Sequence, residues 1–255
     1  MQVLSWETFL AQGLPSPGAS TAISVGVFDG VHRGHQALVD RIMQSGMIPV
    51  IITFKHNYKN VQPSYHGDIS SFDKKMALFA GMGVAITVIA ELTDSFRSMS
   101  GAEFFRLLRE RANMGFLAVG SNFRCGNRQD TDAPLIQELN TREHVATEII
   151  ETLCEDGLPI SSTRIRSAIH QGKLSEAQAM IGRPYTLDLM GAAFQSEGSD
   201  TIYPTGQLGR VLPPCGSYPV ILHSESDSVS SHIRIEKDRL ICPQPVHCIE
   251  FQAFS

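Results

Sequence analysis

The sequence of 255 residues has little positive charge: 21 lysines and arginines stand against 26 acidic residues, for a net charge of −5. Binding to a nucleic-acid backbone needs a basic surface, so we expect no nucleic-acid partner. Long apolar runs are also missing. The longest covers residues 47–54, far short of the ~20 residues that a membrane-spanning helix needs, and no membrane partner is expected.

Disulfide and targeting signals are scarce as well. The five cysteines are an odd number and show no C-x-x-C spacing, which disfavours a disulfide framework or a thiolate metal site. The first 13 residues lack the basic and apolar segments of a secretory signal. Both features predict a cytoplasmic protein with reduced, structural thiols.

Several enzyme signatures are absent too. The sequence contains no G-x-G-x-x-G, G-x-x-x-x-G-K-[ST], H-E-x-x-H or G-x-S-x-G pattern. These absences remove support for dinucleotide-binding folds, P-loop nucleotidases, zinc proteases of the zincin type and α/β-hydrolases.

Apolar strand-like runs alternate with amphipathic helical patterns from residue 21 to about residue 182. Such alternation predicts βαβ units, an α/β fold and a mostly parallel sheet, with ligands at the carboxyl ends of its strands. A glycine and a proline in Gly182-Arg183-Pro184 indicate a domain boundary. Beyond it, frequent prolines, glycines and serines with short strands predict a small antiparallel β domain. The expected strands are 21–27, 47–54, 84–89, 116–119 and 145–151, and the expected helices 34–45, 73–82 and 100–111.

The most informative segment follows the first predicted strand. It runs through a glycine-rich turn into a helix, with His32 and His35 at either side of the helix start and Gly34 between them. Glycines let a backbone approach a ligand closely, and a helix N-terminus attracts phosphate. The pattern therefore predicts an ATP-using site. The alternative is a pair of incidental surface histidines in a flexible turn.

A second candidate site lies just before the domain boundary. Ser162, Thr163 and Arg166 share one face near the start of a predicted helix, with Ser161 or Ser162 as its N-cap. Hydroxyls, helix N–H groups and a guanidinium together suit an anion. The alternative is an ordinary capped helix with exposed arginines. In the following helix, Ser175 and Gln178 are spaced as a structural capping box.

These motifs together resemble the bacterial riboflavin kinase/FMN adenylyltransferase family, the prokaryotic FAD synthetases. They occur in the family's order over residues 20–185. The pieces are G-x-F-D-G-V-H-x-G-H at 26–35, T-F at 53–54, G-x-N-F-x-x-G at 120–126, S-S-T-x-x-R at 161–166 and G-R-P-Y at 182–185. The resemblance implies a Rossmann-like nucleotidyltransferase domain over residues 1–183 and a shortened flavokinase-like β-barrel over residues 184–255.

The implied reaction is FAD synthesis by adenylyl transfer from ATP to FMN, with Mg²⁺ neutralising the triphosphate and pyrophosphate released. The resemblance also assigns roles to particular residues, while the ligands of the metal stay unassigned. It places His32, His35 and Arg166 in catalysis, Gly26, Phe28, Asp29, Gly34, Ser162 and Thr163 at ATP, and Asn122 and Phe123 at the flavin.

The sequence also departs from the family pattern. A family Pro-His-Pro run is replaced around His56, which therefore receives no family role, and Cys125 stands where an aromatic residue is usual. In the C-terminal part Thr205 is retained, but the preceding Gly-Arg is missing and Gln207 replaces an asparagine. No glutamate lies in a matching context for kinase catalysis.

We therefore expect adenylyl transfer without riboflavin phosphorylation. Three alternatives stay open at this point. They are a bifunctional enzyme, a flavin- or nucleotide-binding protein that has lost catalysis, and a transferase acting on another phosphorylated acceptor.

Overall fold

The computed structural model describes residues 1–15, 18–55 and 65–252. By its packing the chain divides into two compact units. The first consists of Met1–Tyr58 and Met76–Cys154, and the second of Lys59–Lys75 and Glu155–Ser255. The last change of unit, between Cys154 and Glu155, comes earlier in the chain than the domain boundary predicted at Gly182. The predicted boundary separates two sequence domains and stays a prediction.

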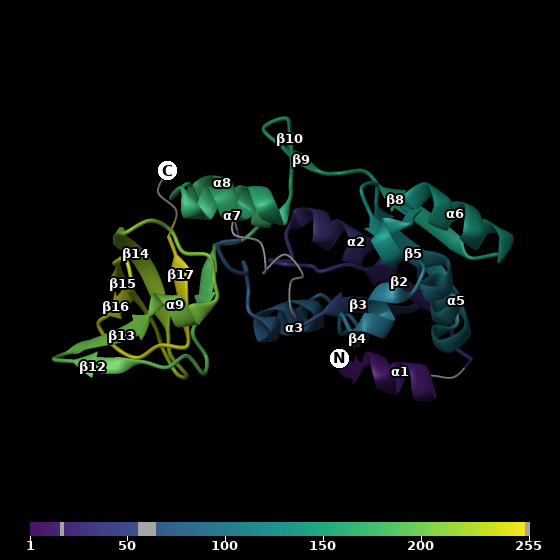
Figure 1. Ribbon diagram of the computed structural model, residues 1–255. Helices are drawn as coiled ribbons and strands as arrows, with labels where there is room; N and C mark the ends of the chain where they lie inside the picture. Colours follow the sequence, from purple (N-terminus) through teal and green to yellow (C-terminus); the bar gives the residue numbers. More distant parts are fainter. Residues whose placement is uncertain (16–17, 56–64, 253–255) are drawn as a thin grey trace. The chain divides into compact units, whose positions relative to one another are not determined.

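The first unit is built on a parallel sheet of six strands in the order β1-β4-β3-β2-β5-β8 (Figure 1). The predicted strands are all present, and the α/β fold is confirmed. An additional edge strand, β1, was not predicted because its four residues, Gln-Val-Leu-Ser, show neither an apolar run nor a polar–apolar alternation. The strands are β1 Gln2–Ser5, β2 Thr21–Val25, β3 Ile48–Phe54, β4 Ile86–Ala90, β5 Met114–Gly120 and β8 Ala146–Ile150.

Helices cover both faces of this sheet, because successive side chains of each strand point to opposite faces. Ile23 and Val25 of β2 pack with α1, α5 and α6, whereas Ala22 packs on the other face with α2 and α3. The helices are α1 Trp6–Gln12, α2 Arg33–Gln44, α3 Phe72–Gly81, α4 Asp94–Ser98, α5 Gly101–Ala112 and α6 Ala133–Arg142.

Strand β2 lies at the centre of the sheet, with β3 on one side and β5 on the other. The chain fills the β3 side first and then returns to add β5 beside β2. Such a reversal opens a crevice at the carboxyl ends of the two strands, where α/β sheets bind their ligands. The loops that follow β2 and β5 are therefore the first place to look for a site.

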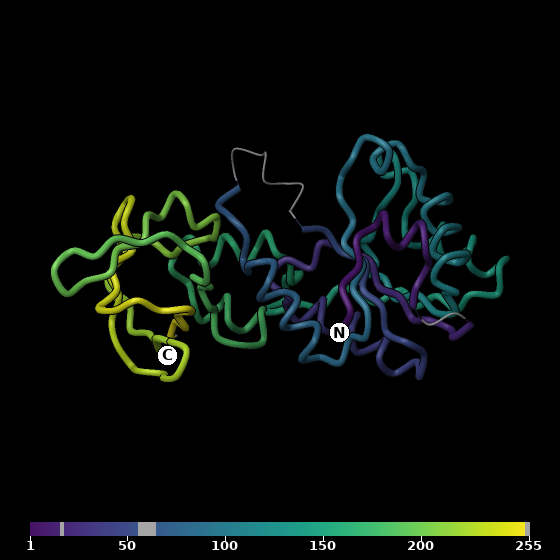
Figure 2. Tube along the Cα trace, turned by 90° about the horizontal axis from the view of Figure 1, so that it is seen from below, coloured from purple at the N-terminus to yellow at the C-terminus, as the bar shows by residue number. Residues whose placement is uncertain are grey.

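The second unit contains an antiparallel sheet of seven strands in the order β11-β17-β14-β15-β16-β13-β12. Its green-to-yellow trace curls around a common interior (Figure 2). Val220 and Leu222, two positions apart on β14, are at most 1% exposed and face this interior. The predicted small antiparallel β domain is confirmed. The strands are β11 Thr186–Asp188, β12 Gln195–Glu197, β13 Asp200–Pro204, β14 Gly216–His223, β15 Ser228–Ile235, β16 Arg239–Cys242 and β17 Cys248–Phe251, with helix α9 at Thr205–Leu208.

This sheet shares its core with two helices, α7 (Ser162–His170) and α8 (Leu174–Ile181). Ile165 and Ile169 of α7 belong to the same buried cluster as Leu187 and Phe251 of the sheet. The short strands β9 (Cys154–Glu155) and β10 (Leu158–Pro159) form a hairpin before α7. The packing of α7 thus depends on residues of the C-terminal sheet.

Of the two predictions about helix capping, the structure confirms the one for α7 and contradicts the one for α8. Ser161 is the N-cap of α7 and accepts a hydrogen bond from the Arg164 backbone N–H at 3.2 Å. The capping box of the next helix is wrong. Helix α8 begins at Leu174 with Lys173 as its N-cap, and Ser175 already lies inside it. The tight α7–α8 turn, in which the Lys173 N–H donates to the Ala168 carbonyl at 2.8 Å, sets that earlier start.

Among the residues that the structure describes, no helix combines the length and apolar character needed to cross a membrane. All five cysteines are free thiols.

Candidate active site

The turn after β2 is fastened to the neighbouring strand β3. The Gly26 N–H donates to the Ile52 carbonyl at 3.0 Å, and the Thr53 hydroxyl donates to the Val27 carbonyl at 3.1 Å. Thr53 belongs to the predicted Thr-Phe motif, and the structure gives it a role in holding the glycine-rich turn. The backbone leaving β2 is therefore fixed before the helix begins.

Beyond this attachment the backbone is strained. Phe28, Gly30 and Val31 have φ angles of 55°, 78° and 39°. A β-branched residue at positive φ is a rare outlier, and such strain persists where the surroundings enforce it. Phe28 and Val31 are each 1% exposed, and the Val31 N–H donates to the Phe28 carbonyl at 3.1 Å. Buried packing thus imposes an uncommon turn at the predicted ATP loop.

The two histidines form one stacked pair. Their ring centroids lie 3.6 Å apart with planes inclined by 20°, and His32 is 6% exposed. Phe28 supports the pair from beneath, with its ring 5.1 Å from that of His35. A Cβ atom at Gly34 would lie 3.3 Å from the His32 imidazole. The glycine of the motif therefore makes room for the stack, and the incidental-surface alternative does not describe His32.

The start of α2 has few groups that would compete with an anion. His32 is its N-cap but makes no capping hydrogen bond through its side chain, and the first turn carries no acidic residue. The carboxamide of Gln36 instead donates to the Val31 carbonyl at 2.8 Å and braces the turn. The positive end of the helix dipole thus lies beside two imidazoles, an arrangement suited to phosphate. Asp29, also predicted at ATP, is buried in this turn.

The loop after β5 leaves the same edge of the sheet, because β2 and β5 pair in parallel with Ser24 opposite Ala118. Asn122 is exposed there, and Phe123 is half-buried against the core. The Phe123 N–H donates to the Gly120 carbonyl at 2.9 Å and closes a turn. The fold therefore brings the histidine pair and the predicted flavin residues to one sheet edge.

An anchor that the sequence did not reveal holds the rest of this loop. The Asp130 carboxylate accepts hydrogen bonds from the Gly101 N–H at 3.0 Å and from the Thr131 hydroxyl at 2.7 Å. Gly126 has φ +80°, and a Cβ atom on it would lie 2.3 Å from the Gly101 nitrogen and 2.1 Å from Asp130. The loop after β5, which carries the predicted flavin residues, is thereby tied to the start of α5. Residues 29 positions apart carry no local signal for such a contact.

Burial raises the pKa of the Cys125 thiol to about 12, with a further contribution from the charge of Asp130. The thiol is protonated at neutral pH and is a poor nucleophile. This agrees with the expectation that Cys125 is structural.

The second candidate site lies on α7 in the other unit. Arg166 is 6% exposed, and its guanidinium carbon lies 4.8 Å from the centroid of the Tyr65 ring. Ser162 is half-buried and Thr163 exposed in the first helical turn. Arg166 is therefore not the exposed arginine that the alternative required.

Arg164 is used differently. Its Nη1 donates to the carbonyls of Glu155 at 2.9 Å and Leu158 at 2.8 Å, which joins α7 to the preceding hairpin. Two arginines two positions apart thus have separate environments, as expected from their helix faces.

The described residues contain no group of three histidine, cysteine, aspartate or glutamate side chains that could hold a metal ion. A cation here would take its ligands mainly from a bound triphosphate, as Mg²⁺ commonly does. His56, to which no role was given, lies outside the described residues.

The first unit has a parallel sheet, and at the point where its strand order reverses a helix begins with an N-terminus suited to phosphate. These features define a Rossmann-like α/β protein. The family described as FAD synthetase matches residues 15–164, and the chain belongs to this family.

Two relatives and one solved structure illustrate the match. A putative bifunctional riboflavin kinase/FMN adenylyltransferase of Geobacillus thermodenitrificans is 32% identical over 68% of the chain and 94% of its own length. A bifunctional riboflavin kinase/FMN adenylyltransferase of Buchnera aphidicola is 26% identical over 74% of the chain, but only 64% of its own length is covered. A crystal structure titled macrolide-efflux protein from Streptococcus pneumoniae shares the fold, with a TM-score of 0.80, 18% identity and 98% of each chain covered.

Proposed function

We propose that the protein synthesises FAD by transferring the adenylyl group of ATP to FMN. A phosphate oxygen of FMN attacks the α-phosphorus of ATP in line, the bond to the bridging oxygen breaks, and pyrophosphate leaves. Because the nucleophile is already an anion, the reaction needs no strong general base. Catalysis rests on positioning and on stabilising charge at the α-phosphate and the leaving group.

The stacked histidine pair carries this proposal. His32 and His35 donate hydrogen bonds to the phosphates of ATP as negative charge moves to pyrophosphate. The loop residues Gly26, Phe28, Asp29 and Gly34 shape the backbone around ATP. This is supported by the strained, buried turn and by the close packing of the imidazoles.

The flavin side is assigned to the loop after β5, in which Asn122 contacts the FMN phosphate and Phe123 the flavin. Support comes from the shared sheet edge and from the anchor at Asp130. Arg166, with Ser162 and Thr163, supplies a second set of phosphate contacts. A buried guanidinium beside the start of a helix suits that role.

Mg²⁺ is proposed as the ion that accompanies ATP and neutralises part of its charge. We also propose a cytoplasmic location, supported by the absence of paired cysteine spacing and by the five free thiols.

We further propose that riboflavin is not phosphorylated. Thr205, the retained kinase residue, donates its hydroxyl to the Lys237 carbonyl at 3.2 Å. Glu236 accepts from Arg234 at 2.9 Å, and Glu250 lies 3.6 Å from His223. Thr205 and both of these glutamates, neither of which lies in a matching kinase context, thus have structural partners. The bifunctional alternative is supported by the names of the relatives, and the binding-protein alternative is disfavoured by the ordered histidine pair.

Two parallel incubations test the assignment. Purified protein is given ATP and Mg²⁺ with either FMN or riboflavin, and the flavins are separated by chromatography. We expect FAD from FMN and no FMN from riboflavin. Protein-dependent FMN would establish the bifunctional enzyme, and absence of FAD from FMN would overturn the proposed function.

A further inference from the structure

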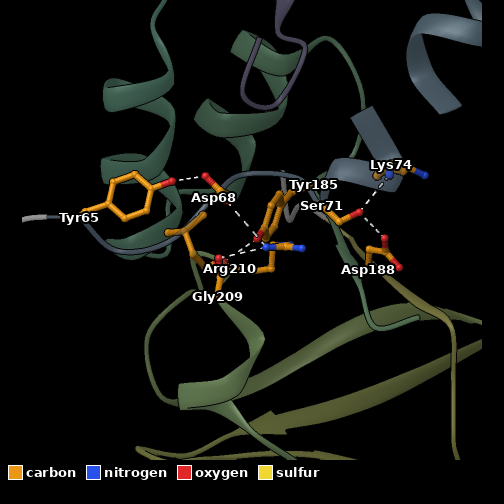
Figure 3. Close-up of polar contacts among 9 residues, drawn as sticks. Tyr65, Asp68, Ser71, Lys74, Tyr185, Asp188, Gly209 and Arg210 are labelled. Atoms are coloured by element: carbon orange, nitrogen blue, oxygen red, sulfur yellow. Dashed lines mark hydrogen bonds and ion pairs between the residues drawn. The ribbon is translucent and has the colours of Figure 1, made fainter. Parts of the chain in front are cut away.

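A short segment of the second unit, residues 65–71, pairs with the connection between α9 and β14; we call it the strap. The Asp68 N–H donates to the Gly209 carbonyl at 3.0 Å, and the Val211 N–H donates to the Asp68 carbonyl at 3.0 Å. Gly67, with φ +105°, approaches so closely that a Cβ atom on it would lie 2.5 Å from the Arg210 carbonyl carbon. The strap is thereby bound by its backbone to residues 209–211 (Figure 3).

The same strap also contacts α7 along its length. The Tyr65 ring covers the Arg166 guanidinium at 4.8 Å, and His66 stacks on His170 with ring centroids 4.1 Å apart. Ile69 of the strap is 2% exposed and packs in the same core as α7. The strap therefore lies against the middle and the end of α7, the helix that carries Arg166.

Side chains connect these two attachments. Arg210 lies 4.0 Å from one oxygen of Asp68, and the other oxygen of Asp68 accepts a hydrogen bond from the Tyr65 hydroxyl (Figure 3). Both members of the ion pair are sheltered, with side chains 21% and 30% exposed. The chain of contacts runs from Arg210 through Asp68 and Tyr65 to Arg166.

The far end of the strap is fixed separately. The Ser71 hydroxyl donates to the Asp188 carboxylate and accepts a hydrogen bond from the Lys74 N–H at 3.0 Å (Figure 3). Contacts at Asp68 and at Ser71 thus hold the strap, and they restrict the positions that the Tyr65 ring can take.

We propose that Tyr65 is a positioning residue for Arg166 and that Asp68 and Arg210 hold Tyr65 for this purpose. An aromatic ring over a guanidinium attracts its cationic face and leaves the N–H groups at its edge directed outward. Those edge groups are the ones that make paired hydrogen bonds to phosphate oxygens. The inference rests on the proposed role of Arg166 at ATP, and it gives Arg210, in the connection between α9 and β14, a part in adenylyl transfer.

Two substitutions at Tyr65 separate the ring from the hydroxyl. Tyr65→Leu removes the ring, and we expect the KM for ATP to rise roughly three- to thirty-fold while the KM for FMN stays unchanged. Tyr65→Phe keeps the ring but loses its hydrogen bond to Asp68, so we expect a smaller rise in the KM for ATP, of about threefold and similar to that of Arg210→Ala. A folded Tyr65→Leu protein with an unchanged KM for ATP would overturn the proposal.

A matched pair of arginines tests the link between the strap and residues 209–211. Arg210→Ala breaks the ion pair with Asp68, whereas Arg239→Ala breaks an ion pair with Glu197 within the C-terminal sheet. We expect only Arg210→Ala to raise the KM for ATP and to speed hydrogen–deuterium exchange in residues 65–71. Equal effects from the two variants would refute the link.

A readout independent of turnover keeps this test distinct from that of the proposed function. Binding of α,β-methylene ATP is measured by calorimetry for the wild type, Tyr65→Leu and Arg239→Ala, each checked by thermal unfolding. If Tyr65→Leu fails to fold, Asp68→Asn replaces it. Weaker binding in the Tyr65 or Asp68 variant alone supports the positioning role even if no FAD is formed. Equal binding in all three contradicts it.

Discussion

The starts of α2 and α7 are both predicted phosphate sites, yet they are built in opposite ways. Helix α7 has a conventional cap, in which Ser161 satisfies the Arg164 N–H. Helix α2 has His32 at the same position without a capping side-chain bond, after a turn with two non-glycine residues at positive φ. Under the proposed function, α2 gives up local stabilisation at its start for phosphate binding. Helix α7 keeps its N-cap, Ser161, and carries the predicted phosphate ligand, Arg166, one turn further along.

The largest expected effect lies at α2. His32→Ala or His35→Ala should lower the rate of FAD formation by roughly 10²-fold or more, because each removes a donor whose bond strengthens in the transition state. FMN binding should change little. Turnover is measured by chromatography of FAD, with the exposed His232→Ala as the control. Near wild-type turnover in both variants would remove the catalytic role of the pair.

The next effect distinguishes the two arginines of α7. Arg166→Lys should raise the KM for ATP and lower activity by about tenfold, because an ammonium lacks the paired donors of a guanidinium and stacks less well on Tyr65. Arg164→Ala should leave the KM for ATP unchanged but lower the free energy of unfolding by about 1–2 kcal/mol through lost bonds to the hairpin. Kinetics and urea unfolding check both. Similar responses at the two positions would mean that the helix faces have been misread.

A third helix start, that of α5, extends the comparison because it anchors the flavin loop. Gly126→Ala should raise the KM for FMN several-fold and cost about 1–3 kcal/mol of stability, since its Cβ atom has no room. Gly157→Ala is the matched control, with φ +73° and open space around its Cβ position. It should cost only about 1 kcal/mol. Equal KM values for FMN in the two variants would argue against a positioned flavin loop.

The smallest effects concern capping itself. Ser161→Ala should reduce stability by about 1 kcal/mol with unchanged kinetic constants. His32→Ser introduces a capping hydroxyl at α2 and should maintain or raise stability by up to about 1 kcal/mol while activity is lost. Thermal unfolding and FAD formation are measured on the same samples. A His32→Ser protein that retains activity would contradict the contrast between the two helix starts.

The strands and long helices could be predicted because each has its own apolar period, as in Ile23 and Val25 on one face of β2 and Ala22 on the other. The motif His32-x-Gly34-His35 likewise lies within one turn, so its local geometry follows from neighbouring residues. Asp130 and Tyr65 could not be found in this way. Their partners, Gly101 and Arg166, are distant in sequence, and no periodic pattern connects them.

Prediction also failed where a local signal met a tertiary constraint. Ser175 and Gln178 have the spacing of a capping box, but the tight turn between α7 and α8 begins the helix before Ser175. Edge strand β1 has only four residues, two of them polar, which is too short a segment to predict as a strand. It exists because β4 offers it a parallel partner, with Val3 opposite Thr87.

The common core of α7 and the C-terminal sheet has a consequence for how such a protein can change over generations. Ile165 and Ile169 share a buried cluster with that sheet and with α8, so deleting residues 184–255 would remove much of the hydrophobic support of the arginine-bearing helix. Selection on adenylyl transfer alone is then enough to retain the sheet. Its loops can change freely except at residues 209–211, which hold the strap, whereas its inward-facing residues cannot.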